Sequence, residues 1–182
     1  GIIHRLDKDT SGVLLIAKTK EAFKFFQDQF LLRKVEKKYI CLVVGTIKEN
    51  GKTIQTFLGR SPNDRRKQKV FLPGDPDAEG KREALTSFQV LDRFEGPSGQ
   101  YTLLEVTPKS GRKHQIRAHM AYLGHPIAGD KLYGYKNQPT PKGLTRQFIH
   151  AGYLKINGLN GTAKEFHSPL SQELDIILKK LS

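Results

Sequence analysis

The hydrophobic pattern near the start of the chain changes from a continuous run to a helical period. The apolar run at residues 12–18 predicts a buried strand. Thr19 follows it, and threonine is a suitable residue to cap the first turn of a helix. Three phenylalanines then recur at helical spacing: Phe23, Phe26 and Phe30. We therefore expect an amphipathic helix over residues 20–34.

The middle of the chain is rich in β-forming residues. Residues 37–59 hold two such runs around Asn50-Gly51, a dipeptide that suits tight turns, which predicts an antiparallel hairpin. Residues 60–82 are polar, basic and rich in turn formers around one short apolar piece, which predicts a long loop or hairpin. Residues 83–94 and 100–108 alternate apolar and polar positions, which predicts a second antiparallel pair.

The last third of the chain contains two helical patterns. In residues 112–124, Ile116, Met120 and Leu123 share one helical face, and Gly124 is a natural stop. Residues 172–182 predict a short amphipathic helix. We expect an α+β fold in which a mixed, mainly antiparallel central sheet is flanked by helices, as a single domain over residues 1–182.

Charge points to the kind of partner. The 182 residues include 31 lysines and arginines against 18 acidic residues, so the net charge is +13. A strong positive field favours a polyanion such as nucleic acid, and the charge alone leaves a basic, well-solvated surface equally open. No membrane partner is expected. The sequence has neither the roughly 18-residue apolar run of a membrane span nor the order of a signal peptide, which predicts a cytoplasmic protein.

Several kinds of chemistry lack their sequence signals. Among six histidines, His114 and His119 are five residues apart, whereas two metal ligands on one helical face need four, so no metal is expected. The single Cys41 lies in an apolar stretch and is expected to pack as a small hydrophobe. Ser11 lacks the frame of a hydrolase nucleophile, and no phosphate-binding loop is present, so no nucleotide cofactor is expected.

The remaining candidate is a carboxylate among cations. Asp7 follows Arg5 in HRLDKDTSG, and the basic segment GRKHQIRAH at residues 111–119 is able to fold against it. These residues alone leave two interpretations open, a structural salt bridge and a catalytic carboxylate.

Three segments in order resemble the RluA family of pseudouridine synthases. They are HRLDKDTSG, KKYICLVVG, and GRKHQIRAHMAYLGHPIAGDKLYG, with weaker similarity at residues 58–70 and 146–156. The resemblance implies the pseudouridine synthase fold and an enzyme that isomerises uridine to pseudouridine in ribosomal or transfer RNA. It also implies that no cofactor takes part, and we expect a monomer.

The resemblance also implies roles for individual residues. Asp7 would be the catalytic carboxylate, Arg117 its partner and Tyr39 an active-site aromatic. Arg5 would enter the space that the flipped uridine leaves or contact the flanking bases. We expect further RNA contacts from basic residues of two segments: Arg60, Arg65, Arg66, Lys67, Arg112, Lys113 and His114.

The chain departs from the family pattern in two places. Family members carry an upstream stretch of the catalytic domain before the HRLD signature, so the resemblance predicts that this chain is incomplete at its N-terminus. The segment at residues 157–170 differs from the family's sequence between the last strands, where we expect local changes. The alternative function is a non-catalytic RNA-binding module, which would bind phosphates without positioning the sugar.

Overall fold

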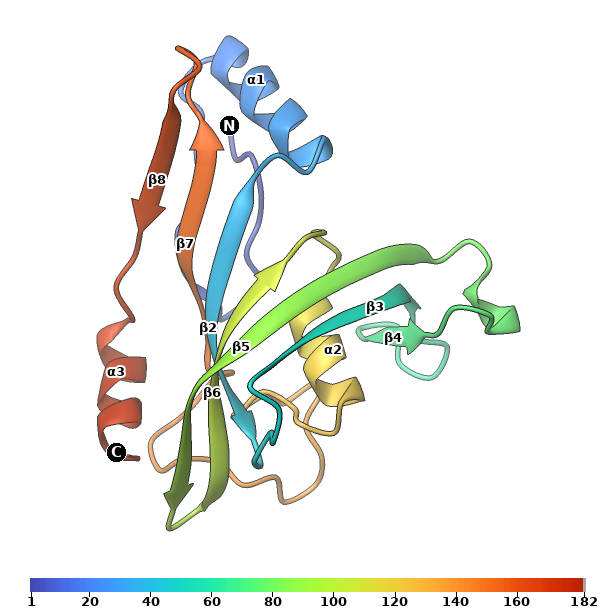
Figure 1. Cartoon of the computed structure of the whole chain (residues 1–182), viewed down its shortest axis with the longest axis vertical. Helices are drawn as coiled ribbons and strands as arrows, with labels where there is room; N and C mark the ends of the chain where they lie inside the picture. Colours follow the sequence, from blue (N-terminus) through green and yellow to red (C-terminus); the bar gives the residue numbers. More distant parts are fainter. Residues whose placement is uncertain (182) are drawn as a thin grey trace.

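The computed structural model describes residues 1–181, and its centre is a twisted eight-stranded sheet (Figure 1). The strands are β1 (Ser11–Gly12), β2 (Glu36–Val44), β3 (Gly51–Arg60), β4 (Gln68–Phe71), β5 (Arg82–Gly96), β6 (Gly99–Pro108), β7 (Ile149–Asn157) and β8 (Ala163–His167). The helices are α1 (Lys20–Leu31), α2 (Gln115–Tyr122), α3 (Gln172–Lys179) and the short 3-10 helix η1 (Pro76–Ala78).

The strand order is β1-β7-β2-β6-β5-β3-β4, and β8 also pairs with β7. Only β1 and β7 run parallel, while the other pairs are antiparallel. In Figure 1, β2 and β7 run upright, whereas β3 and β5 curve away to the right. The expected α+β class with a mixed, mainly antiparallel sheet is confirmed. No helix within residues 1–181 is long and apolar enough to cross a membrane.

Several local expectations are confirmed. Thr19 caps α1, because its hydroxyl accepts a hydrogen bond from the N–H of Ala22 at 3.1 Å. β5 and β6 form the expected antiparallel pair. Residues 60–82 were expected to form a loop or hairpin, and within them β4 pairs with β3 as a hairpin. α3 matches the amphipathic tail, with Leu174 and Ile177 buried. Cys41 is fully buried, as its apolar neighbours predict.

The expected hairpin over residues 37–59 is wrong. β2 pairs with β6 and β7, while β3 pairs with β4 and β5, so two strands separate the predicted partners. Asn50-Gly51 marks the start of β3, where the carbonyl of Asn50 accepts a hydrogen bond from the N–H of Val90 at 2.9 Å. A turn-forming dipeptide is a local signal, whereas strand pairing follows the burial of β2 between two longer-range partners.

The expected strand at residues 12–18 is also wrong in most of its length. Only Ser11–Gly12 pairs with β7, and Leu14 and Ile16 remain 42% and 58% exposed. Gly12 has a φ of 119°, and a Cβ there would lie 2.2 Å from the carbonyl oxygen of Ala151. The glycine therefore permits a close approach to β7, after which the chain leaves the sheet.

Helix α2 packs against the sheet through the hydrophobic core. Six consecutive residues of this helix, Gln115 to Met120, are buried. Ile116 and Met120 join the main hydrophobic cluster, while Ala118 joins a second cluster with Leu58 and Ala84. The predicted helix over residues 112–124 begins three residues late, since His114 adopts a left-handed conformation with φ of 53°.

Candidate active site

The loop that carries Asp7 is held by a distant segment that precedes β7. The side chain of Gln147 donates a hydrogen bond to the carbonyl of Lys8. Arg146 donates another to the carbonyl of Asp9 at 2.9 Å. Because both contacts reach the loop backbone, they fix the path of the chain on the C-terminal side of Asp7.

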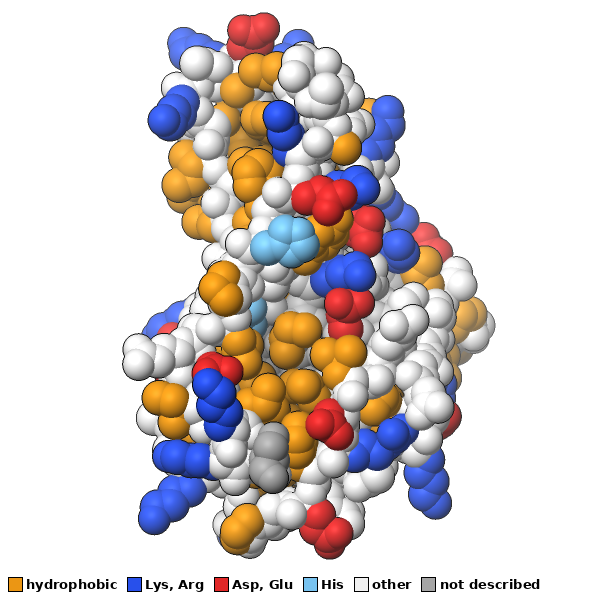
Figure 2. All heavy atoms as spheres, turned by 60° about the vertical axis from the view of Figure 1, so that its left-hand side comes forward, with side chains coloured by type: hydrophobic (Ala, Val, Ile, Leu, Met, Phe, Trp, Pro, Cys, Tyr) orange, Lys and Arg blue, Asp and Glu red, His pale blue; other side chains and the backbone are white. Residues whose placement is uncertain are grey.

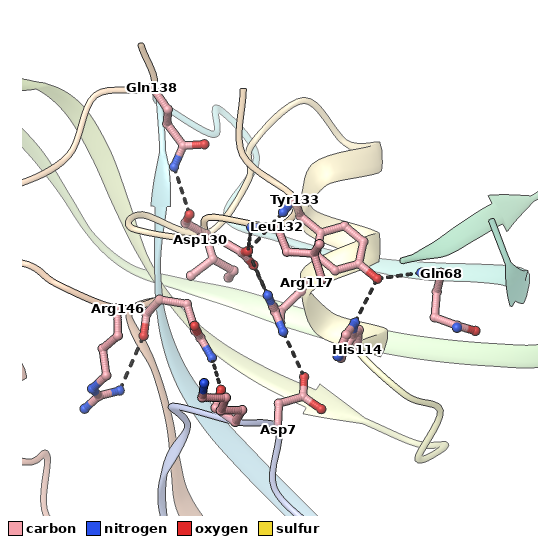
Figure 3. A network of polar contacts seen from close by, with 12 residues as sticks. Asp7, Gln68, His114, Arg117, Asp130, Leu132, Tyr133, Gln138 and Arg146 are labelled. Atoms are coloured by element: carbon pink, nitrogen blue, oxygen red, sulfur yellow. Dashed lines mark hydrogen bonds and ion pairs between the residues drawn. The ribbon is translucent and has the colours of Figure 1, made fainter. Parts of the chain in front are cut away.

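Arg117 of α2 joins Asp7 to a second carboxylate, Asp130 (Figure 3). Its Nη1 lies 3.6 Å from Oδ2 of Asp7. Its Nε and Nη2 donate to the two oxygens of Asp130 at 2.6 and 2.8 Å. The structure therefore brings together the predicted pair of Asp7 and Arg117, and it adds a carboxylate that binds the arginine more tightly.

The Arg117–Asp130 pair is charged and buried. Burial alone would raise the pKa of Asp130, but hydrogen bonds from Arg117 and from the N–H of Tyr133 outweigh it and lower the pKa. Burial opposes the charge of Arg117 too, but the hydrogen bond to Asp130 raises its pKa. The side chain of Asp130 is 0% exposed, against 20% for Asp7. Asp130 thus orients the arginine, and Asp7 keeps access to the solvent.

Asp130 and Tyr133 were not expected in the site, although both lie in the segment GDKLYG that resembles the family. The Tyr133 ring lies over the guanidinium of Arg117, 5.2 Å from its centre. The Tyr133 hydroxyl accepts from the N–H of Gln68 at 2.7 Å and contacts Nδ1 of His114 at 3.1 Å. Tyr133 therefore connects α2 to the β3–β4 hairpin. In the sequence, only the resemblance of GDKLYG to the family pattern pointed to a role for Asp130 and Tyr133 in the site.

A cavity of about 290 Å³ opens beside Asp7. This volume lies just below the usual range for ligand sites, roughly 300–1,000 Å³. Its walls come from the Asp7 loop, α1, β2, the end of β6, α2, β7 and the segment before α2: His4, Arg5, Leu6, Asp7, Thr10, Phe30, Lys37, Tyr39, Pro108, Ser110, Gly111, Arg112, Lys113, His114, Gln115, Ile116, Arg117 and Ile149. The three predicted catalytic residues, Asp7, Tyr39 and Arg117, thus share one cavity.

Tyr39 projects into this cavity from β2. Burial raises the pKa of its hydroxyl well above the usual value, and the charge of Asp7 raises it further. Both effects disfavour the phenolate, so the hydroxyl stays protonated.

The predicted RNA-binding residues form two groups. Four line the cavity: Arg5, Arg112, Lys113 and His114. The other four lie on the β3–β4 hairpin: Arg60, Arg65, Arg66 and Lys67. Asp64 pairs with Arg66 at 2.8 Å and offsets part of the charge of this hairpin. The hairpin still borders the site, because Lys67 lies 6.0 Å from the centre of the Tyr133 ring.

No group of three or more histidine, cysteine, aspartate or glutamate side chains able to hold a metal occurs within residues 1–181. His119 is fully buried between two threonines, with its ring nitrogens 3.0 Å from the hydroxyl of Thr56 and 2.8 Å from that of Thr86. Burial lowers its pKa to about 4, so the ring is neutral. His119 therefore links α2 to β3 and β5.

Residues 1–122 match a family model described as RNA pseudouridylate synthase. An uncharacterized RNA pseudouridine synthase of Chloroflexus aurantiacus is 42% identical over all 182 residues, which cover 53% of that protein. Ribosomal large subunit pseudouridine synthase C of Yersinia pestis is 37% identical over 95% of this chain and 52% of its own length. The chain thus spans about half the length of these curated relatives.

A solved structure is similar along nearly the whole chain. It is human RNA pseudouridylate synthase domain containing 1, which is 30% identical with a TM-score of 0.81. The similarity covers 99% of this chain and 79% of the human one. The expected pseudouridine synthase fold is therefore confirmed. Sequence and structure agree that this chain belongs to the RNA pseudouridylate synthase family, in the RluA group that its three signature segments resemble.

Proposed function

We propose that this chain forms the catalytic unit of an enzyme that isomerises uridine to pseudouridine in RNA, with Asp7 as the catalytic carboxylate. The observation that carries the proposal is the placement of Asp7 at the cavity wall, 3.6 Å from Nη1 of Arg117 and close enough to Tyr39 to affect its pKa. Family membership supports the same reaction.

The reaction needs no net oxidant and no added group. The bond from C1′ of the ribose to N1 of uracil breaks, the base turns, a bond from C1′ to C5 forms, and the proton of C5 is released while N1 gains one. Asp7 has two possible parts in this sequence, attack on C1′ or removal of the C2′ proton to give a glycal. Both routes use the same carboxylate, whose Oδ2 lies 3.6 Å from Nη1 of Arg117.

Tyr39 would hold the detached base by stacking. The raised pKa of Tyr39 keeps its hydroxyl protonated. This hydroxyl could therefore accept the C5 proton only after it had given its own proton to another group. We therefore assign to Tyr39 the positioning of the base between cleavage and the new bond, which prevents its loss.

The substrate would be RNA with an accessible uridine. A stacked uridine hides its glycosidic bond, so the nucleotide must turn out of the helix into the cavity, which is easiest in loops and bulges. The name of the Yersinia pestis relative favours ribosomal RNA. The net charge of +13 suits a polyanionic substrate. A monomeric state and a cytoplasmic location stay predictions.

The test compares Asp7→Asn with Asp9→Asn. Asp9 is exposed, lies in the same loop and has a φ of 65°, which asparagine tolerates, so it is a matched control. Both variants and the parent are incubated with RNA transcribed with tritium at C5 of uridine, and tritium release is measured. We expect release from the parent and from Asp9→Asn and none from Asp7→Asn.

Activity in Asp7→Asn would contradict the role of Asp7. If the folded parent binds RNA but releases no tritium, this chain is a non-catalytic RNA-binding module. The two failures are therefore distinguishable.

A further inference from the structure

Lys37 is a cavity residue whose charge has no acidic partner. Its side chain is half-buried in the wall of the cavity, and no carboxylate within residues 1–181 pairs with it. Burial lowers its pKa, and no acidic group offsets that effect. An ammonium group that is partly removed from water, with the Phe30 ring 6.0 Å from its Nζ but no counter-charge, costs folding free energy that an anionic ligand would recover.

The charges around Lys37 favour an anion. Among the residues that line the cavity, five are lysines or arginines and one is acidic: Arg5, Lys37, Arg112, Lys113 and Arg117 against Asp7. Arg117 is already paired with Asp130 and Asp7. Lys37 lies against the segment before α2, since a Cβ on Gly111 would be 3.6 Å from its Nζ. The ammonium group of Lys37 therefore lies beside the backbone of Gly111, and both residues line the cavity.

The place of Lys37 on β2 relates it to the base-binding residue. Lys37 and Tyr39 both line the cavity, so they project from the same face of the strand, two residues apart. This spacing corresponds to about 7 Å along the strand. A nucleotide spans a comparable length from its base to its phosphate. A uridine stacked on Tyr39 would therefore bring a phosphate within reach of Lys37.

The neighbouring Lys38, in contrast to Lys37, has an acidic partner. It faces the other side of the sheet, where it pairs with Glu105 at 3.0 Å and lies 5.8 Å from the centre of the Tyr153 ring. It shares a groove there with Glu36 and His167. Figure 2, in which the side with β8 and α3 comes forward, shows acidic and basic side chains close together at mid-height. Mixed charge of this kind does not attract a polyanion.

We propose that Lys37 binds the phosphate of the target uridine and so places its ribose over Asp7. This inference rests on the proposed function, and it adds a substrate-binding residue that holds the sugar–phosphate side of the nucleotide. A charge-assisted hydrogen bond to a phosphate oxygen would anchor one end of the nucleotide, while Tyr39 stacks on the base.

The test uses the parent, Lys37→Met, Lys37→Arg and the matched control Lys38→Met. Their affinities for a ten-nucleotide oligouridylate are measured over a series of KCl concentrations, and tritium release from labelled RNA is measured in parallel. We expect Lys37→Met to bind roughly 10- to 100-fold more weakly at low salt. Its salt slope should be shallower by about 0.7, the value for one phosphate of a single strand. Lys37→Arg and Lys38→Met should keep the slope of the parent.

Thermal unfolding separates this role from a structural one. Because Lys37 has no acidic partner, Lys37→Met should keep or raise the melting temperature, whereas a residue needed for the fold would lower it. Equal slopes for Lys37→Met and Lys38→Met would overturn the proposal. An unchanged slope with slower tritium release would overturn it too, because the ammonium group would then act on the base. If the parent releases no tritium but the slope differs as expected, the phosphate contact stands and the isomerase assignment fails.

Discussion

Replacement of Asp130 by alanine should destabilise the fold far more than replacement of Asp7. The side chain of Asp130 is fully buried and accepts four hydrogen bonds, two from Arg117 and one each from the N–H groups of Leu132 and Tyr133. Its removal leaves Arg117, with a side chain only 8% exposed, facing Asp7 alone at 3.6 Å. Loss of one partner of a buried ion pair costs about 3–5 kcal/mol.

The corresponding loss for Asp7→Ala should stay below about 1 kcal/mol, because Asp7 makes one longer ion pair and is partly exposed. In a chain of this size, the loss of about 3–5 kcal/mol in Asp130→Ala corresponds to a melting temperature lower by roughly 6–20 °C. Urea unfolding followed by circular dichroism measures both free energies of unfolding. Equal losses in the two variants, or a loss below 1 kcal/mol for Asp130→Ala, would refute the view that Asp130 is the main counter-ion of Arg117.

Two other predictions concern pH and salt. Burial lowers the pKa of His119 to about 4 from 6.5, so the unfolded chain binds a proton first as the pH falls. The free energy of unfolding should therefore decrease as the pH falls from 6.5 to 4, by roughly 3 kcal/mol for this group. Urea titrations at these two pH values measure the change. A free energy of unfolding that does not change with pH would contradict a buried neutral ring. Neutralising Arg65, Arg66 and Lys67 together should reduce the salt slope of RNA binding, mainly through Arg65 and Lys67, because Asp64 already pairs with Arg66. The expected reduction is about 1.4, and an unchanged slope would mean that the hairpin does not contact RNA.

Local sequence signals predicted the elements whose determinants are close together in the chain. The cap of α1 depends on Thr19 and the N–H three residues later. The β5–β6 pair depends on alternating residues on either side of a short turn. The candidate site residues Asp7, Tyr39 and Arg117 came from segments that resemble a family, because charge and spacing alone favoured a structural salt bridge over a catalytic carboxylate.

The tertiary structure decided what depends on distant partners. β2 pairs with β6 and β7 instead of the nearby β3, since burial on both sides outweighs the turn preference of Asn50-Gly51. Asp130 became the main partner of Arg117 because a bidentate contact in a dry interior is stronger than the longer contact to Asp7. Likewise, the basic character of Lys37 and Lys38 is plain in the sequence, but only the pleat of β2 places one in the cavity and the other beside Glu105. Local propensities act between neighbours in the chain, whereas burial and charge pairing act between residues that meet only in the folded state.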